Sequence, residues 1–464
     1  MEVTRREFIK VSGMTSVAVL CMSSLKGAGA RDKQAMFESE TLPVIKRCDV
    51  LIIGGGFAGL TAARKFAKAG KKVLLVERRI YLGREVTSVY RPWFDINPND
   101  GELPTVLKSC IEEQIEQTDS SKTLLRFDHV KRSLEDSLFE TGVEILYASN
   151  VIQLLADGNR LSGLVIGNKS GRQAILSKLV LDCTETASVV HLTDQPFGKK
   201  AASVAYTRTM EFTDVGALSG KSIPVPSELG LENNQALLQA GYLGEGHYYV
   251  TCPMSFQTPD KDPLAITRME AEAWQRCTKV AQYLHQNVPE FADAYFTNSA
   301  FQLSGPYTRK MADSNHAKSR KYLNSSVSIG KGRMPLSAFA TPYHNLYCIN
   351  EASLLADELA DYLATPVGAG VIAESVSERL LSHWSETAYQ GTVETIEEGY
   401  PQPYANGQSI REKHSPQHGK PYSRITIDNT AIPVIESVDV LVVGGGTSGA
   451  PATYTAAKAG KKTM

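Results

Sequence analysis

The sequence predicts an α/β fold in which a parallel sheet carries a glycine-rich turn, a β-rich insert interrupts the sheet, and a separate α+β region follows. Three apolar runs in the sequence predict it. A short apolar run at 49–53 leads into the glycines and then into an apolar helix. Two further apolar runs, at 179–182 and 345–349, end in polar residues. Short apolar runs that alternate with helices are typical of buried parallel strands.

The first strand–helix–strand unit is complete. Residues 49–53 form the expected strand, residues 60–69 form the helix, and Gly70 ends that helix. Residues 73–76 form the second strand, and Glu77 follows it directly. Each part occurs in the order that a dinucleotide-binding unit requires, so the pattern is much more specific than its glycines alone.

Each residue type in this unit has a physical task. Gly54 permits the tight turn, Gly56 lets a pyrophosphate approach the backbone, and Gly59 lets the helix pack closely on the strand. The free N–H groups at the helix N-terminus favour an anion. Glu77 is placed to accept hydrogen bonds from a ribose. The same pattern serves FAD and NAD, so later segments must distinguish between them.

Three later segments favour FAD. Residues 179–184 form an apolar strand that ends in Asp182 and Thr184. Residues 345–351 form another strand, which ends in the acidic Glu351. The small residues at 366–373 then begin a helix, whose N-terminus would stabilise negative charge on a reduced flavin.

Together these segments resemble the large family of FAD-dependent oxidoreductases with two dinucleotide-binding motifs, including its exported bacterial members. The resemblance implies a Rossmann-like FAD-binding domain with a β-rich insert and an α+β substrate domain, with FAD as the cofactor and a small molecule as the substrate. The residues expected to contact FAD are Gly54, Gly56, Phe57, Ala58, Gly59, Glu77, Arg78, Arg84, Val151, Thr184, Glu351, Gly368 and Gly370.

Two segments depart from the family pattern. Glu185 and Thr186 stand where glycine and aspartate are usual, and the loop 81–88 lacks the usual double glycine. Both departures favour an alternative in which this chain is a non-catalytic module that scaffolds a second flavin domain. In the main interpretation the chain transfers a hydride between a small organic substrate and the flavin. An NAD-linked dehydrogenase is a further alternative.

Candidate catalytic side chains are few. Arg84 and Thr87 lie in the loop that leads toward the flavin in this family, and Arg309 is placed to bind an anionic substrate. His344, directly before the strand at 345–349, is the best-placed histidine for acid–base chemistry. For each of these residues a structural role is the alternative.

The expected organisation has six parts. Residues 42–195 begin the FAD-binding domain and contain the β insert, and residues 341–390 complete it. Residues 196–340 form the substrate domain, with a helix near 263–285. Residues 391–431 are rich in Gly, Pro, Tyr and charge, which is typical of a linker. The remaining parts are the two ends of the chain.

The first 30 residues resemble a twin-arginine (Tat) signal peptide. Arg5 and Arg6 precede a weakly apolar stretch, and residues 28–30 read Ala-Gly-Ala. We therefore expect export by the Tat machinery to the periplasm or another extracytoplasmic compartment, which disfavours soluble NAD(P)H as a reductant. The alternative is an N-terminal amphipathic helix of the mature fold.

Residues 432–464 repeat residues 42–74 with 17 identities in 33 positions. This internal repeat predicts the start of a second FAD- or NAD-binding unit. The partner of Glu77 would be residue 467, so we expect this unit to be a truncated start of a tandem module. The alternative is a βα unit that joins the first sheet.

Composition excludes other classes of protein. The chain has 49 Lys and Arg against 50 Asp and Glu, which argues against a nucleic-acid-binding protein. It contains no apolar run long enough for an integral membrane segment. Its 7 cysteines are scattered without a CxxC pair, so we expect no metal site.

Overall fold

The computed structural model describes residues 34–36, 40–95, 103–112, 122–198, 203–257, 264–305, 309–312, 320–397, 423–427 and 431–464. The chain divides into two compact units, and one of them comprises Thr41–Thr258 and Arg276–Ile427. This larger unit contains the main sheet and the glycine-rich turn. The expected signal peptide lies outside the described residues.

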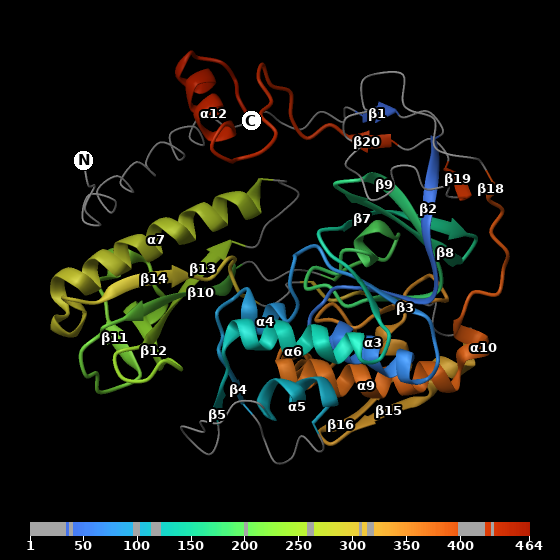
Figure 1. Cartoon of the computed structure of the whole chain (residues 1–464), viewed down its shortest axis with the longest axis horizontal. Helices are drawn as coiled ribbons and strands as arrows, with labels where there is room; N and C mark the ends of the chain where they lie inside the picture. The colour runs from blue at the N-terminus through green and yellow to red at the C-terminus, as the bar shows by residue number, and fades with distance from the viewer. Residues whose placement is uncertain are drawn as a thin grey trace. The chain divides into compact units, whose positions relative to one another are not determined.

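A nine-stranded mixed sheet forms the centre of the larger unit (Figure 1). Its parallel part has the order β6–β3–β2–β9–β17. These strands are β2 (Glu40–Ile53), β3 (Val73–Val76), β6 (Glu144–Leu146), β9 (Gly171–Asp182) and β17 (Leu346–Cys348). Because parallel strands bring their carboxyl ends to one edge, the segments that follow β2, β3, β9 and β17 meet there.

Antiparallel strands extend this sheet. β7 (Asn150–Asp157) and β8 (Arg160–Asn168) form a meander with β9, in the place expected for the β-rich insert. β18 (Ile396–Glu397) and β19 (Ser423–Ile427) add to β2. The expected linker at 391–431 therefore contributes two strands to the sheet, and its other residues from 398 to 422 and 428 to 430 lie outside the described part. Ile427 of β19 packs in a buried cluster with Leu42 of β2, and this contact holds β19 against the sheet.

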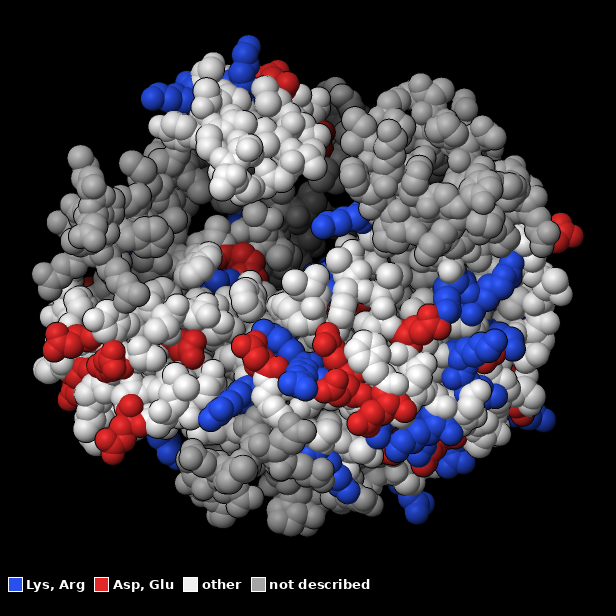
Figure 2. All heavy atoms as spheres, viewed as in Figure 1, with Lys and Arg blue, Asp and Glu red and all other residues white. Residues whose placement is uncertain are grey.

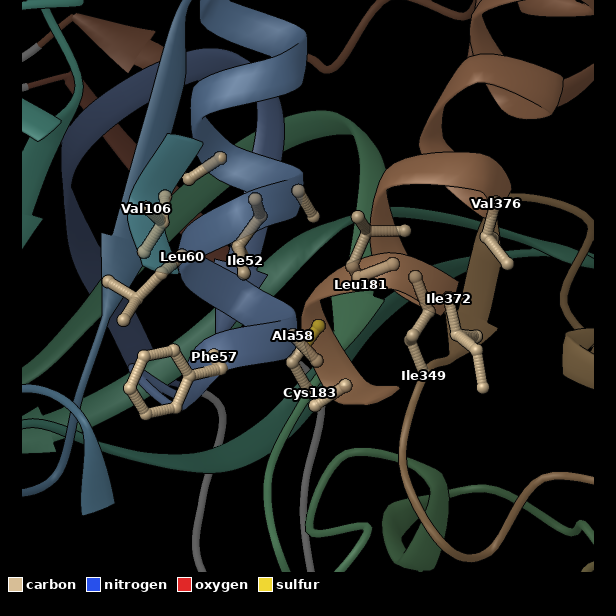
Figure 3. Close-up of a cluster of buried hydrophobic side chains, with 14 of the residues drawn as sticks. Ile52, Phe57, Ala58, Leu60, Val106, Leu181, Cys183, Ile349, Ile372 and Val376 are labelled. Atoms are coloured by element: carbon tan, nitrogen blue, oxygen red, sulfur yellow. The ribbon is translucent and has the colours of Figure 1, made fainter. Parts of the chain in front are cut away.

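Helices α3 (Phe57–Lys68) and α9 (Pro366–Ser382) pack together over the sheet (Figure 3). Ile52 and Leu181 from the strands, Leu60 from α3 and Ile372 from α9 are fully buried between them. Burying one such side chain contributes about 1.5–3 kcal/mol. The other helices of this part are α4 (Arg84–Thr87), α5 (Thr105–Glu112), α6 (Phe127–Phe139), α8 (Asp357–Leu363) and α10 (Trp384–Thr387).

A five-stranded antiparallel sheet forms most of the expected substrate domain. Its order is β11–β12–β13–β10–β14. The strands are β10 (Ser203–Thr213), β11 (Ser222–Pro224), β12 (Gln235–Ala240), β13 (Tyr248–Gln257) and β14 (Tyr295–Ser299). Helix α7 (Ala265–Asn287) follows β13, and its bounds are close to the expected 263–285. The predicted fold class, an α/β domain with a β-rich insert and an α+β region, is confirmed.

Four short strands form two separate two-stranded sheets, and β1 and β20 form a third. β4 (Trp93–Asp95) pairs with β5 (Lys122–Leu124), and β15 (Ser326–Ile329) pairs with β16 (Gly332–Pro335). β1 (Gln34–Met36) pairs with β20 (Ala431–Pro433) in the smaller unit. None of these pairs joins the main sheet.

The repeated segment forms the same turn as its first copy. Gly444 has φ +107°, against +104° at Gly54, and helix α12 (Gly449–Lys458) follows it. Lys462 N–H donates to the Asp439 carboxylate at 2.9 Å, just as Lys72 N–H donates to Asp49 at 2.9 Å. Among the described strands, the nine-stranded sheet contains none from this segment.

Charged side chains are mixed on the face that Figure 2 shows, where Lys and Arg lie among Asp and Glu. Lys131 pairs with Asp128 at 3.0 Å, and Arg132 lies 3.5 Å from Asp136 on the same helix. Within the described ranges, no helix combines the length and apolarity needed to cross a membrane. No three or more His, Cys, Asp or Glu among those residues are grouped so as to hold a metal ion.

Candidate functional site

The glycine-rich turn lies between β2 and α3, at the carboxyl edge of the parallel strands. A Cβ atom on Gly54 would stand 2.6 Å from the Cys183 carbonyl oxygen, and one on Gly59 would stand 2.0 Å from the Gly54 carbonyl oxygen. Both contacts are with backbone, so neither can be relieved by a side-chain movement. At Gly54 and Gly59 the structure therefore contains the close backbone contacts that only glycine allows.

Glu77 lies beside this turn and is 3% exposed. Gly55 N–H donates to its Oε2 at 2.7 Å. Arg79 donates to its Oε1 through the backbone N–H at 2.8 Å and through the guanidinium at 3.0 Å. These bonds fix the carboxylate at the end of β3, where a ribose contact is expected.

A second wall of the site follows β9. The Asp182 carboxylate is fully buried and accepts four hydrogen bonds: from the Thr184 N–H at 3.0 Å, the Thr184 hydroxyl at 2.7 Å, and the N–H groups of Val189 at 2.8 Å and Val190 at 3.0 Å. Burial raises the pKa of Asp182, and these hydrogen bonds oppose the rise. The network fixes the turn at 184–190 and so places Glu185 in the cleft.

Glu185 pairs with three arginines. Its Oε1 lies 2.5 Å from Arg78 Nη2, 2.5 Å from Arg79 Nη2 and 3.5 Å from Arg84 Nε. Burial alone would raise the pKa of Glu185, but the charges of Arg84, Arg79 and Arg78 lower it to about 2. The unexpected glutamate is therefore the shared anion of an arginine cluster.

The third wall comprises the segment after β17 and the start of α9. Asn350 donates to the Asp182 carbonyl oxygen at 3.2 Å, which joins this segment to β9. Gly368 N–H donates to the Thr365 hydroxyl at 3.0 Å, so Thr365 caps α9. A Cβ atom on Gly368 would stand 1.8 Å from the Tyr362 carbonyl oxygen. Glu351 and Ala369 line the cleft from this side.

Seven of the predicted cofactor residues line one cleft: Gly54, Gly56, Ala58, Glu77, Arg84, Thr184 and Glu351. Three others lie close to it: Phe57 and Gly59 begin α3, and Arg78 pairs with Glu185. Gly368 and Gly370 lie on either side of the cleft-lining Ala369, and a Cβ on Gly370 would stand 3.3 Å from Thr61 Oγ1 of α3. Val151 instead packs against a hydrophobic cluster from β7.

The structure does not gather the predicted catalytic residues. Thr87 is fully buried, and its hydroxyl donates to the Leu82 and Gly83 carbonyl oxygens at 2.9 Å, so it stabilises α4. His344 precedes β17, at the opposite end of that strand from Glu351, and its Nε2 lies 3.1 Å from the Asn159 side chain. Only Arg84 of the four lines the cleft.

The fourth predicted catalytic residue, Arg309, lies near His191. Burial and the Arg309 charge both lower the pKa of His191. The neighbours of Arg309, residues 307 and 308, lie outside the described residues.

Glu85 is a site residue that no sequence pattern indicated. The loop 81–88 contains the short helix α4, whose N-cap is Gly83 with φ +70°. Phe57 N–H donates to Glu85 Oε1 at 3.2 Å, so the carboxylate lies at the N-terminus of α3. Burial raises the pKa of Glu85, and the Arg84 charge opposes the rise.

A second polar network, in the substrate domain, was also not predicted. His247 Nε2 lies 2.9 Å from Glu211 Oε1, and the Tyr249 hydroxyl donates to the same oxygen at 3.2 Å. Leu243 N–H donates to His247 Nδ1 at 3.0 Å, so in the neutral ring Nε2 carries the hydrogen. Glu211 and His247 are 36 residues apart, so no local pattern reveals their contact.

Comparison with known proteins gives one family. The model of the family described as FAD dependent oxidoreductase matches residues 49–312, which is more than half of the chain. The thiamine thiazole synthase of Aeropyrum pernix is 28% identical over 121 residues, which cover 26% of this chain and 44% of that protein. The digeranylgeranylglycerophospholipid reductase of Picrophilus torridus is 25% identical over 150 residues, covering 29% and 38%.

The chain spans about half or less of the length of the curated relatives it matches. Among solved structures, a geranylgeranyl bacteriochlorophyll reductase-like protein from Thermoplasma acidophilum has a TM-score of 0.46 at 15% identity, covering 74% of this chain and 80% of that one. The p-nitrophenol 4-monooxygenase of Pseudomonas putida has a TM-score of 0.42 at 16% identity, covering 74% and 82%.

Proposed function

Because this chain belongs to the family of FAD-dependent oxidoreductases and its cofactor is FAD, we propose that it transfers a hydride between a small organic substrate and the flavin. The observation that carries the proposal is the meeting of the glycine-rich turn, Glu77 and the start of α9 at one edge of the sheet. A ligand at that edge touches segments that are far apart in sequence, as dinucleotide cofactors do in open α/β sheets.

The residues present fit the adenosine diphosphate half of FAD. The closeness of Gly54 and Gly59 to backbone carbonyl oxygens keeps the turn free of side chains. Glu77 would hold the ribose, and the N–H groups at the start of α3 would hold the pyrophosphate. When bound, FAD accepts or donates a hydride.

The flavin half would lie toward α9. The N-terminus of α9 contributes the positive end of the helix dipole, which favours negative charge there. Its Ala369 lines the cleft, and Glu351 lines it beside the end of β17. The five-stranded sheet of β10 to β14 would then provide the substrate side, for which the sequence contains no specific motif.

Export is a further part of the proposal. Arg5 and Arg6, the apolar stretch and Ala28-Gly29-Ala30 support a Tat signal peptide. We expect residues 1–30 fused to a folded reporter to direct it to the periplasm. Replacement of Arg5 and Arg6 by lysine should leave the reporter in the cytoplasm, and continued export of that variant would contradict the proposal.

The second glycine turn supports a tandem arrangement. Its Gly444 and Gly449 repeat the geometry of Gly54 and Gly59, since a Cβ on Gly449 would stand 1.7 Å from the Gly444 carbonyl oxygen. We propose that this segment begins a second dinucleotide-binding module. Sequencing the gene beyond codon 464 tests this directly, because a continued frame should encode a glutamate at position 467.

The central test is the flavin itself. We expect the purified full chain to carry extractable FAD and to lose its flavin absorbance on reduction with dithionite. Glu77→Ala should weaken FAD binding, while Glu140→Ala, an exposed change at the end of α6, should not. A colourless chain that binds no FAD would refute the proposal, and a reducible flavin that never turns over would identify a non-catalytic module.

A further inference from the structure

The N-terminus of α3 already has an anion from within the chain. The Glu85 carboxylate accepts the Phe57 N–H at 3.2 Å. A Cβ atom on Gly56 would stand 2.3 Å from Glu85 Oε1, so the carboxylate lies directly against the Gly56 backbone. Gly56 is the N-cap of α3 and offers no side-chain cap, which leaves Glu85 as the group that meets the helix dipole.

This is the place that a dinucleotide pyrophosphate takes in such a turn, because it approaches the second glycine and the first N–H groups of the helix. Two anions cannot share those donors without strong repulsion at such short range. The turn therefore fits the cofactor, but the Glu85 carboxylate occupies the position of its phosphates.

Glu85 is weakly held where it lies. Its Oε2 atom is buried and has no hydrogen-bond partner. An unpaired buried carboxylate oxygen is unfavourable, so movement of this side chain toward solvent or another donor relieves a cost. Glu185, by contrast, is paired with three arginines and is fixed.

The backbone before Glu85 provides a point of rotation. Gly83 has φ +70° and is the N-cap of α4, and its N–H donates to the Gly55 carbonyl oxygen at 2.8 Å. Arg84 lies between Gly83 and Glu85, and its buried Nε has no hydrogen-bond partner, at 3.5 Å from Glu185. Arg84 is thus a cation beside the same turn, and its Nε–H group makes no hydrogen bond.

We propose that Glu85 is an internal competitor of the FAD pyrophosphate: its carboxylate leaves the N-terminus of α3 when the cofactor binds, and Arg84 then donates to the phosphates. Glu85 sets how tightly the chain holds FAD by making each binding event displace a bound anion. This inference rests on the FAD-binding part of the proposed function.

The test compares Glu85→Gln with the wild-type chain and with Glu140→Gln, which removes an equal charge from an exposed site. Two ligands are titrated into apoprotein: FAD, followed by flavin fluorescence, and ADP, followed by calorimetry. We expect Glu85→Gln to bind both ligands about tenfold more tightly, or about 1.4 kcal/mol. Glu140→Gln should bind them as the wild type does.

A second readout guards against a simple loss of folding. The melting temperature of the Glu85→Gln apoprotein shows whether the variant folds, and saturating ADP should raise that temperature by more than it does in the wild type. Glu85→Asp, whose shorter side chain withdraws the charge, should show an intermediate affinity. Equal or weaker ADP and FAD binding in both variants would overturn the proposal.

The outcomes separate the two proposals. A chain in which Glu85→Gln tightens ADP binding but which never binds FAD supports the competition and refutes the flavin assignment. A chain that binds FAD with the same affinity in all variants supports the flavin assignment and refutes the competition.

Discussion

Glu185→Gln tests the arginine cluster through its dependence on pH. The folded-state pKa of Glu185 is lowered from 4.5 to about 2. A group whose pKa is lower in the folded state stabilises the fold above its unfolded pKa, and that contribution is lost as pH falls through the folded pKa. The charged form of Glu185 should therefore stabilise the protein at neutral pH and lose this effect in acid.

The magnitude follows from the pKa difference. At roughly 1.36 kcal/mol per pKa unit, the charge of Glu185 contributes about 3 kcal/mol at pH 6 and about 1.5 kcal/mol at pH 3. The side chain of Glu185 is 16% exposed, so solvent screens this interaction little. The glutamine side chain of the Glu185→Gln variant lacks the charge but keeps the size, so the variant should be less stable by these amounts.

The measurement is urea unfolding of both proteins at several values of pH, followed by tryptophan fluorescence. The stability gap should narrow by about half between pH 6 and pH 3. Asp357→Asn is the control, because Asp357 is exposed and pairs only with Lys310 among the contacts described for it, at 2.7 Å. A gap for Glu185→Gln that stays constant with pH would refute the reasoning, since a packing defect does not titrate.

The turn, the Asp182 network and His344 each allow a further test. Gly59→Ala should reduce both the urea midpoint and the amount of copurified FAD, because the new methyl group would meet the Gly54 carbonyl oxygen at 2.0 Å. Asp182→Asn should lower the unfolding free energy by about 3 kcal/mol. One Asp182 carboxylate oxygen accepts hydrogen bonds from two backbone N–H groups, and an amide nitrogen in its place cannot accept them. His344→Ala should leave the rate of flavin reduction unchanged in stopped-flow measurements, because His344 lies beside Asn159 at the other end of β17; a large fall in that rate would show that His344 acts at the flavin.

Local order explains what the sequence predicted well. The strand, the glycines, the helix and Glu77 lie within 29 consecutive residues, from 49 to 77, and the close contact of Gly59 with the Gly54 carbonyl oxygen and the Gly55–Glu77 hydrogen bond both lie inside that segment. The period of the apolar residues and the spacing of the glycines indicate such local contacts directly. The parallel sheet and the β-rich insert followed in the same way from apolar runs and turn residues.

Non-local contacts explain what the sequence missed. Glu85 reaches the N-terminus of α3 from 28 residues away, and Glu185 meets Arg78 from 107 residues away. Neither spacing forms a pattern along the chain. His344 stays an untested prediction, but its place argues against a role at the flavin: it precedes its strand, and in a parallel sheet the residue before a strand lies at the edge opposite the ligand site.

The repeated segment shows which features of the first site come from local contacts and which come from non-local ones. Residues 433–464 share the glycine spacing of the first copy, and they adopt the same φ at Gly444 and the same Asp439–Lys462 hydrogen bond. Apart from the pairing of Pro433 with Gln34, the described residues of this segment form one strand bridge, between Val440 and Thr463. The turn itself is therefore encoded locally. The features that distinguish the first site, the Glu85 carboxylate and the arginine cluster around Glu185, come from residues outside the first copy at 42–74. We therefore expect distant parts of the fold, and not the glycines alone, to set the affinity of the first turn for a dinucleotide.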